Sequence, residues 1–340
     1  MKELSINVEN FTYKIIIKDN LLDNLSFYVS NVYKNKKVYI ITDENVAKFY
    51  LKQVINSLNE TYQVDYVIIK SGESFKSLET ISSICKQLID KNIKRNDLII
   101  SLGGGVVSDI SGFVASILYR GVPYINISTS LLSDVDASIG GKTGIDFANH
   151  KNILGTFKQP LVVLIDPLTL NTLPQEEIEN GIGEIIKHGA IGNIELLKKL
   201  EKGIQINEDI IYESLKVKKY FVEKDVFDQK ERMLLNFGHT FGHIIELKEN
   251  LKHGMAVGIG MLMAIEFGIS LKITNPNCYK IIKDILEKYH LPTTKYNYQD
   301  YLEDVCYDKK NLSGTINFIL LKDLGEAIIY PIEEKLLIKK

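Results

Sequence analysis

Short apolar runs alternate with helical patterns in the first half of the chain. Four runs rich in β-branched residues, each bounded by turn residues, cover 37–43, 64–69, 97–102 and 124–128. Apolar residues at helical spacing fill 45–60 and 77–91 between them. Continuous apolar runs are typical of parallel strands that are buried on both faces. Their alternation with helices predicts an α/β fold with a Rossmann-like open parallel sheet and right-handed crossovers.

The hydrophobic period changes after about residue 160. One further strand is predicted over 161–166, and from 174 to about 290 the apolar spacing is mostly helical, with acidic and lysine-rich faces. A chain of 340 residues is too long for one small core. We therefore expect an α/β domain over 1–160 and a mainly α-helical domain over 161–340, with the boundary near 155–170.

Composition and charge exclude several classes of protein. The formal net charge is −2, so the chain lacks the basic footprint of a nucleic-acid-binding protein. Cys85, Cys278 and Cys306 are widely spaced, which argues against a disulfide framework and fits a reducing cytosol. We expect no signal peptide, and no window is expected to reach the apolar length of a membrane span. We expect a cytoplasmic protein that binds neither membranes nor nucleic acid.

A glycine-rich turn, Gly103–Gly105, follows the third predicted strand and opens a helix. Glycine lets the backbone approach a ligand closely, and N–H groups at a helix start attract phosphate oxygens. The turn lacks the G-x-G-x-x-G spacing of the dinucleotide fingerprint. Asp43 ends the first strand, where an acid can accept a hydrogen bond from a ribose hydroxyl or cap the next helix. We interpret this sheet edge as a ligand site, with a tight turn that binds nothing as the alternative.

A second glycine cluster covers 138–144 and is followed by Lys151 and Asn152. It places Lys142 and Lys151 beside flexible backbone, and lysine is well suited to binding phosphate. The cluster lacks the G-x-x-x-x-G-K spacing, and no strand leads directly into it. These two differences exclude a P-loop nucleotide triphosphatase.

Histidine and glutamate side chains of the second half form a candidate metal site. His239 and His243 are four residues apart in a predicted helix, so they share one face. His253 follows ten residues later, and Glu184 adds a carboxylate from another predicted helix. Such a set can hold a divalent transition metal and leave one position open. Spacing alone favours His239 and His243 as ligands; the alternative is that these histidines cap helices or donate to carbonyl groups.

An ordered set of motifs is more specific than any of its members. It comprises Gly72-Glu73-x-x-Lys76, Gly103-Gly104-Gly105-Val106-Val107-x-Asp109, Tyr119-Arg120-Gly121, Ser138-Ile139-Gly140-Gly141-Lys142-Thr143-Gly144, Lys151-Asn152, Thr172-Leu173-Pro174, Glu184-x-x-Lys187, Arg232-x-x-Leu235-Asn236-x-Gly238-His239-Thr240-x-Gly242-His243, His253-Gly254 and Asp308-Lys309-Lys310. In this set the chain resembles the 3-dehydroquinate synthases, a family of the sugar phosphate cyclase superfamily. The resemblance extends over about residues 35–325.

The resemblance implies a lyase of the shikimate pathway, which leads to the aromatic amino acids. Its members convert 3-deoxy-D-arabino-heptulosonate 7-phosphate to 3-dehydroquinate and phosphate, with NAD and one Zn²⁺ or Co²⁺. NAD takes a hydride from a secondary alcohol whose oxygen the metal polarises, and this oxidation acidifies the adjacent carbon. Phosphate then leaves, the hydride returns and the ring closes.

The resemblance also implies a residue for each role. The metal ligands are Glu184, His239 and His253, which differs from the pair that spacing alone favours. NAD contacts are Asp43, Asn45, Glu73, Lys76, Gly104, Gly105, Val106, Asp109, Thr129, Ser130, Lys142, Lys151, Thr169, Thr172 and Leu173. Substrate contacts are Asp136, Lys142, Asn152, Lys187, Lys218, Arg232, Asn236, His243 and Lys309, of which Lys142, Lys187, Lys218, Asn236 and His243 are catalytic. Arg120 reaches the site of a neighbouring subunit, which implies a homodimer.

Several positions have simpler interpretations or depart from the family pattern. Without the resemblance, Lys187 and Lys218 would be solvated surface residues, and Glu184 with Lys187 a plain helix ion pair. The departures are Ser108 for glycine, Ser130 for threonine, Thr169 for an apolar or aromatic residue, Gly183 for alanine and Met255 for glutamate. An acid lost beside His253 is expected to weaken metal binding.

Three other functions were weighed against this one. A sister cyclase that acts on another sugar phosphate shares the metal and NAD, but its substrate lacks the carboxylate that Arg232 is suited to bind. A metal-dependent NAD alcohol dehydrogenase would accumulate NADH in proportion to product. A binding protein with a dead metal site is disfavoured because the set of proposed ligands is intact.

Overall fold

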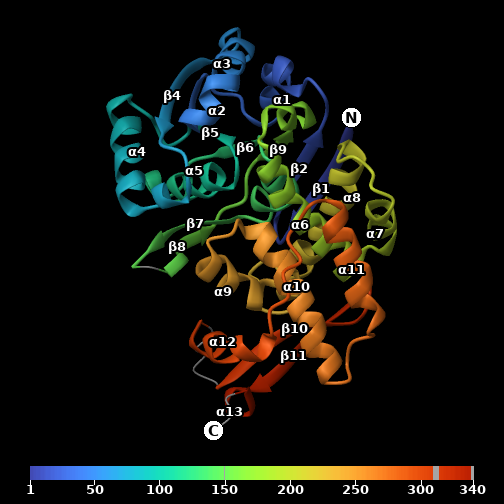
Figure 1. The fold of residues 1–340 in the computed structure, drawn as a ribbon. Coiled ribbons are helices and arrows are strands. Elements are labelled where there is room, and N and C mark those ends of the chain that lie inside the picture. The colour runs from blue at the N-terminus through green and yellow to red at the C-terminus, as the bar shows by residue number, and fades with distance from the viewer. Residues whose placement is uncertain (149, 309–313, 338–340) are drawn as a thin grey trace. The chain divides into compact units, whose positions relative to one another are not determined.

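The computed structural model describes residues 1–148, 150–308 and 314–337 (Figure 1). The chain divides into two compact units, Met1–Pro174 and Gln175–Lys340. The first unit ends later than the boundary expected at residue 160. It does so because the strand β9 (Val162–Ile165) pairs with two strands of the first unit.

The first unit is built on a seven-stranded sheet with the order β1-β2-β9-β6-β5-β3-β4. Its other strands are β1 (Lys2–Val8), β2 (Phe11–Ile17), β3 (Lys37–Asp43), β4 (Gln63–Ile69), β5 (Leu98–Gly103) and β6 (Tyr124–Ser128). All neighbouring pairs are parallel except β1 and β2, which form an antiparallel pair at one edge. The expected open parallel sheet is confirmed, and β1 and β2 are additions that the sequence analysis did not predict.

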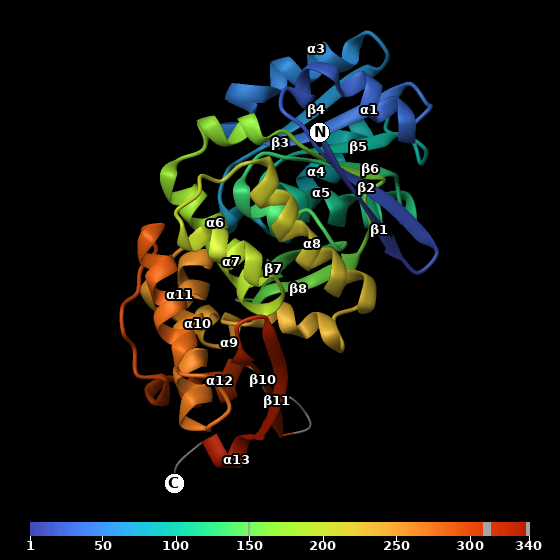
Figure 2. The ribbon, with the colours of Figure 1, turned by 90° about the vertical axis from the view of Figure 1, so that its right-hand side faces the viewer.

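Helices cover both faces of this sheet (Figures 1 and 2). They are α1 (Leu25–Val32), α2 (Glu44–Val46), α3 (Lys52–Asn59), α4 (Leu78–Asp90) and α5 (Gly105–Ile117). Ile40 faces a core cluster with residues of α1 and α3, whereas Ile41 faces a second cluster with residues of α4 and α5. Successive strand residues point to opposite faces, so β3 needs a continuous apolar run.

A two-stranded hairpin lies between the sheet strands β6 and β9 in the chain. It consists of β7 (Lys142–Phe147) and β8 (His150–Phe157), and β7 packs against α5. A Cβ on Gly155 would lie 2.2 Å from the carbonyl oxygen of Thr143 on the facing strand. Lys142 and Lys151, which were expected beside flexible backbone, lie in these paired strands, whereas Gly140 and Gly141 of the glycine cluster precede β7.

The second unit is mainly helical, as expected. Its helices are α6 (Gln175–Gly192), α7 (Ile194–Glu201), α8 (Glu208–Lys224), α9 (His239–Glu249), α10 (His253–Ser270), α11 (Asn277–Lys288), α12 (Leu302–Asp308) and α13 (Glu334–Leu337). An antiparallel hairpin of β10 (Thr315–Asp323) and β11 (Glu326–Glu333) was not predicted.

Helix α10 is the core of the second unit, in contact with α6, α9, α11 and β10. Every residue from Gly254 to Ile265 is buried, and a helix that is apolar all round needs neighbours on every side. Among the described residues, α10 is the one helix long and apolar enough to span a membrane, yet 78% of that window is buried. The expectation that no window would reach this length was therefore wrong.

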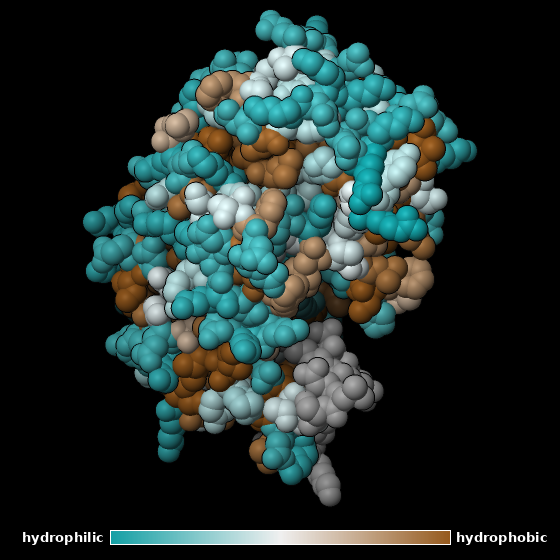
Figure 3. All heavy atoms as spheres, turned by 180° about the vertical axis from the view of Figure 1, so that it is seen from behind, coloured by the Kyte–Doolittle hydropathy of each residue, from teal (hydrophilic) through white to brown (hydrophobic). Residues whose placement is uncertain are grey.

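Exposed residues are mostly hydrophilic on the face shown in Figure 3, and exposed apolar residues form small separate groups. Scattered apolar groups of this size are ordinary on the surface of globular proteins.

Candidate functional site

The carboxyl ends of the parallel strands carry several of the predicted NAD contacts. Asp43 is the last residue of β3, Gly104 follows β5 directly, and Thr129 follows β6 directly. The chain runs from β3 to β4 on one side and then crosses to β5 on the other side of β3. This reversal is a topological switch point, which is where ligands bind in open α/β sheets.

The glycine turn at this edge is closely packed. Gly104 precedes the first residue of α5, and a Cβ on Gly104 would lie 2.9 Å from the Ser130 hydroxyl oxygen. A Cβ on Gly105 would lie 3.1 Å from the Cβ of Ala137. These distances leave little room for a side chain at either position, and the N–H groups at the start of a helix attract phosphate oxygens. Ser108, a departure from the family pattern, lies inside α5, where a side chain requires no unusual backbone.

Asp43 acts as a helix cap in the structure. Its Oδ1 accepts hydrogen bonds from the backbone N–H groups of Asn45 at 2.8 Å and Val46 at 3.0 Å. Asp43 therefore caps the next helix, which was the simpler of the two interpretations of this residue. Both hydrogen bonds use the same carboxylate oxygen. Asn45 itself is exposed at the start of α2.

Lys76 is the buried centre of a polar cluster that contains four of the predicted site residues. Its Nζ lies 2.6 Å from Asp109 Oδ2 and 3.8 Å from Glu73 Oε1, and it donates to Asn152 Oδ1. The residue is 4% exposed. Burial lowers the pKa of Lys76, but Asp109 and Glu73 outweigh it and raise that pKa above its usual value. The ammonium group therefore stays charged and links the loop after β4 to α5 and β8.

The remaining predicted contacts of the first unit lie in different surroundings. Thr169 is buried, its hydroxyl donates to the Asp166 carbonyl at 2.8 Å, and its own carbonyl accepts from Tyr50. That hydroxyl is therefore engaged within the fold. The exposed or partly exposed residues are Arg120, Val106, Ser130, Asp136, Lys142, Lys151, Thr172 and Leu173.

Three side chains of the second unit converge where a metal ion was predicted. Glu184 lies in α6, and His239 and His253 are the first residues of α9 and α10. Glu184 Oε1 lies 3.6 Å from His239 Nε2 and 3.4 Å from His253 Nε2. The three ligand atoms of this group lie within 4.8 Å of one another. Four ligands at about 2.1 Å around Zn²⁺ are themselves roughly 3.3–3.5 Å apart, so these spacings match the edges of a tetrahedral site.

Hydrogen bonds fix which nitrogen of each ring faces the carboxylate. His239 Nδ1 lies 3.2 Å from the Phe237 carbonyl oxygen, and His253 Nδ1 lies 3.1 Å from Glu246 Oε2. Both partners only accept, so both Nδ1 atoms carry protons, and in the neutral rings the Nε2 lone pairs face Glu184 Oε1. That oxygen is buried without a hydrogen-bond partner among the described residues. Two lone pairs and an anionic oxygen repel one another unless a cation lies between them, so this donor set fits a divalent metal.

The protonation states of the cluster depend on one another. Burial raises the pKa of Glu184, but Lys187 and the two histidines hold it well below its usual value. Burial, with the nearby Lys187 charge, holds the pKa of His239 well below its usual value. Burial opposes protonation of His253 as well, yet Glu184 and Glu246 raise its pKa to about 9. A proton and a metal ion therefore compete for His253 Nε2.

His243 lies one turn after His239, with ring centroids 5.3 Å apart. The ligand group that contains Glu184 and His239 includes His253 rather than His243, which instead groups with Glu246 and His253. The geometry thus favours the ligand set implied by the resemblance over the pair favoured by spacing. His239 and His253 begin different helices, yet their ring centroids are only 5.0 Å apart.

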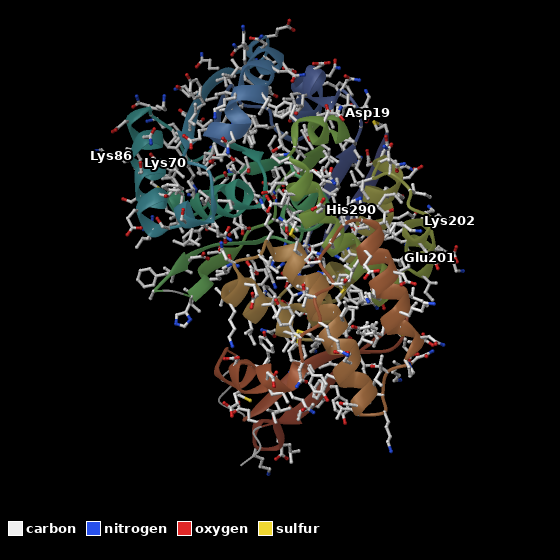
Figure 4. The ribbon with its side chains drawn as sticks, in the orientation of Figure 1. Asp19, Lys70, Lys86, Glu201, Lys202 and His290 are labelled. Atoms are coloured by element: carbon white, nitrogen blue, oxygen red, sulfur yellow. The ribbon has the colours of Figure 1, made fainter. Side chains whose placement is uncertain are left out.

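His290 lies outside this cluster. It is exposed and follows the end of α11 (Figure 4).

Three cationic side chains of the second unit are unusually well buried. Lys187, which pairs with Glu184, is 1% exposed, and Lys218 of α8 is 4% exposed. Arg232 is also buried, and its guanidinium donates to the Val226 carbonyl at 2.7 Å. The interpretation of Lys187 and Lys218 as solvated surface residues was therefore wrong. It followed the general rule that lysine side chains are rarely buried. Asn236 is partly buried near the start of α9, and the predicted contact Lys309 lies outside the described residues.

The sequence analysis missed one acid of this cluster, Glu246. It follows His239 by seven residues and His243 by three, so helical spacing places all three on one face. Met255, at the position where the family pattern has glutamate, is buried in α10.

Models of known families match most of the chain. The 3-dehydroquinate synthase N-terminal model matches residues 66–180, and the C-terminal model matches residues 181–311. The chain belongs to the 3-dehydroquinate synthase family. Family members include the 3-dehydroquinate synthase of Clostridium botulinum, 42% identical over 97% of each chain. That of Clostridium acetobutylicum is 40% identical over 98% of each chain.

Solved structures of other cyclases share the fold of this 3-dehydroquinate synthase family member. A 2-deoxy-scyllo-inosose synthase complexed with carbaglucose-6-phosphate, NAD⁺ and Co²⁺ matches with a TM-score of 0.89 at 19% identity, covering 99% of this chain and 98% of that one. The 2-epi-5-epi-valiolone synthase of Streptomyces hygroscopicus, with NAD⁺ and Zn²⁺ bound, matches with a TM-score of 0.86 at 26% identity, covering 97% and 96%. An iron-containing alcohol dehydrogenase matches with a TM-score of 0.65 over 87% of this chain.

Proposed function

We propose that this protein is a 3-dehydroquinate synthase, which converts 3-deoxy-D-arabino-heptulosonate 7-phosphate to 3-dehydroquinate and phosphate in the shikimate pathway. The observation that carries the proposal is the match of both halves of the family model, with relatives about 40% identical over nearly the whole chain. The alcohol dehydrogenase alternative shares the fold at only 15% identity.

We assign NAD to the first unit, at the carboxyl edge of its sheet. The N-terminus of α5 would receive the pyrophosphate, because N–H groups at a helix start attract phosphate oxygens and the glycine turn lets a ligand approach the backbone closely. Asp43 Oδ2 would accept from a ribose hydroxyl, since both of its capping bonds use Oδ1. Glu73, Lys76 and Asp109 would keep the adjoining loop in place. The cyclase structures that contain NAD⁺ support this assignment.

We assign a divalent metal, Zn²⁺ or Co²⁺, to Glu184, His239 and His253 in the second unit. When bound, the metal polarises the oxygen of the carbon that is oxidised, and NAD accepts and returns the hydride. Three protein ligands leave a coordination position for that oxygen. Lys187, which pairs with the ligand Glu184, holds this carboxylate ionised and so ready to bind a cation.

We assign the remaining predicted residues to the substrate. Arg232 would bind the carboxylate of the heptulosonate, which sister cyclase substrates lack. Lysine side chains and His243 would bind the phosphate and steady its charge as it leaves, while the phosphate oxygens accept the eliminated proton. The substrate set is Asp136, Lys142, Asn152, Lys187, Lys218, Arg232, Asn236, His243 and Lys309.

We further propose that the protein is a cytoplasmic homodimer in which Arg120 reaches the partner's site. Apolar side chains near Arg120 in the sequence or on the β7–β8 hairpin are exposed: Tyr119 at 44%, Ile153 at 60% and Phe157 at 43%. Exposed apolar groups of this kind are common at interfaces between subunits. The three cysteines are free thiols, which supports a reducing compartment.

Phosphate release tests the proposed activity. The purified protein with NAD and Zn²⁺ should release phosphate from the heptulosonate phosphate and little from glucose 6-phosphate, without net NADH. A chelator should abolish release, and added Zn²⁺ or Co²⁺ should restore it. Preference for glucose 6-phosphate would indicate a sister cyclase, and NADH formed in proportion to product would indicate a dehydrogenase.

A further inference from the structure

The two ring nitrogens of His253 each lie close to a different carboxylate group. Its Nε2 lies 3.4 Å from Glu184 Oε1, while its Nδ1 lies 3.1 Å from Glu246 Oε2. We propose that Glu246 is the positioning residue of the metal centre: it accepts the Nδ1 proton of His253 and so presents Nε2 to the ion. The inference rests on the proposed metal site, and it does not depend on the identity of the substrate.

The two histidine ligands are supported in different ways. His239 Nδ1 contacts the backbone carbonyl of Phe237, a neutral acceptor that no substitution removes. His253 Nδ1 contacts the side-chain carboxyl group of Glu246. A carboxylate behind a ligating imidazole fixes its tautomer and makes its other nitrogen a better donor to the metal. His253 is therefore the ligand whose donor strength this side chain controls.

The position of Glu246 suits this role. It lies in α9, which begins at His239, so one helix carries both a ligand and the support for another ligand. Its side chain is only 12% exposed, which shields the contact with His253 from water and strengthens it. The next carboxylate of α9, Glu249, is exposed at the end of the helix and offers a matched control.

A second metal ion is the competing interpretation of the same atoms. His243, Glu246 and His253 also place ligand atoms within 4.8 Å of one another. An ion there, together with one at Glu184, would need a metal on both nitrogens of His253 and thus loss of both ring protons. A hydrogen bond to Glu246 requires only the neutral ring, so we favour positioning over a second ion.

Metal affinity of the full-length apoprotein tests the inference, with Zn²⁺ titrated against a chromophoric chelator. Glu246→Ala should weaken Zn²⁺ binding by about 10–100-fold, the usual effect of losing such a partner. Glu246→Gln should recover part of the loss, because its amide oxygen still accepts the Nδ1 proton. Glu249→Ala should bind as the unsubstituted protein does, with one Zn²⁺ per chain in all four proteins.

A visible spectrum of the Co²⁺-loaded forms provides a second readout. Glu246→Ala should shift the Co²⁺ absorption bands, whereas a merely structural role would leave the bands of the folded protein unchanged. Unaltered Zn²⁺ affinity in Glu246→Ala would overturn the inference. Two Zn²⁺ ions per chain, reduced to one by Glu246→Ala, would overturn it in favour of a second ion. Tight, Glu246-dependent Zn²⁺ binding without phosphate release would instead defeat the proposed function alone.

Discussion

The backbones of Gly183 and Gly254 are in direct contact. A Cβ on Gly183 would lie 2.2 Å from the Gly254 carbonyl oxygen, and one on Gly254 would lie 1.8 Å from the carbonyl oxygen of Asn180. The Asn180 side chain also accepts a hydrogen bond from the Gly254 N–H at 2.7 Å. Glu184 and His253 each adjoin one of these glycines in sequence. The close approach of α6 and α10 is therefore what places two proposed metal ligands side by side.

Gly254→Ala should separate these two helices. We expect the unfolding free energy to fall by about 1–3 kcal/mol, the usual cost of overpacking, despite the better helix propensity of alanine. Zn²⁺ affinity should fall too, since Glu184 and His253 move apart. Urea unfolding and Zn²⁺ titration measure the two effects. The control is Gly192→Ala at the end of α6, where a Cβ would lie 3.1 Å from a methyl group of Val217 and 3.9 Å from the Phe221 ring. Equal losses in both variants would argue against this explanation.

Glu184→Gln should destabilise the protein even without metal. The substitution leaves Lys187, which is 1% exposed, without its ionic partner. Breaking a buried pair in this way usually costs about 3–5 kcal/mol. Thermal or urea unfolding of the chelator-treated protein measures this loss. A second substitution, Lys187→Met, should recover much of the stability, and a double variant no more stable than Glu184→Gln would contradict the expectation.

Asp109→Asn should weaken the first unit through Lys76. Asp109 Oδ2 lies 2.6 Å from the buried Lys76 Nζ, whereas Lys91 and Asp65 form a 3.0 Å pair with both side chains at least a third exposed. We expect Asp109→Asn to lower the unfolding free energy by about 3 kcal/mol and Asp65→Asn by less than about 1 kcal/mol. Urea unfolding compares the two variants. If the exposed pair proves as costly to break, burial is not what gives the Lys76 pair its strength.

Asp134 should make stability depend on pH. Burial raises its pKa to about 8, while Ser128 lowers it, and neither carboxylate oxygen has a hydrogen-bond partner among the described residues. Since the unfolded pKa is about 3.9, the folded state holds a proton that the unfolded state releases between these values. This contribution to stability is complete below about pH 4 and is lost as the pH rises through 8.

Asp134→Asn removes this titration and tests it. Between pH 5 and 8 the stability of the unsubstituted protein should fall relative to the variant, at most by about 1.4 kcal/mol per pH unit. Urea unfolding at several pH values gives the difference. Asp19→Asn serves as the control, because Asp19 is exposed in the same unit (Figure 4). Parallel pH profiles for the Asp134 variant and the unsubstituted protein would refute the assignment.

The sequence revealed the central strands because of where they lie. Strands β3, β5 and β6 are buried on both faces, so their apolar runs are continuous and easily recognised. At the edge, β1 alternates between exposed and buried residues, as a strand with one covered face does, and a search for continuous runs overlooked it. The β7–β8 hairpin was not predicted for a different reason, because glycines in its sequence are typical of a loop.

Local spacing could not decide between His243 and His253. Helical periodicity reports only neighbours on one helix, and it correctly placed His239 and His243 on one face of α9. Which histidine faces Glu184 depends on the contact between two helices far apart in sequence. The motif set implied His239 and His253 as the neighbours of Glu184, and both lie beside it in the structure. Such a set can do this because the resemblance extends over the whole fold and not over one helix. Glu246 was visible on the same face, but nothing in its spacing distinguished a support for a ligand from an ordinary surface acid.

Helix α10 begins with a proposed ligand and continues as the core of its unit. An ion captured by its first residue binds the native state and not the unfolded chain, so its binding free energy adds to the stability of everything packed around that helix. The unfolding temperature of the second unit should consequently rise with the concentration of metal available to the protein. In a cell short of zinc, the amount of folded protein would fall together with its activity.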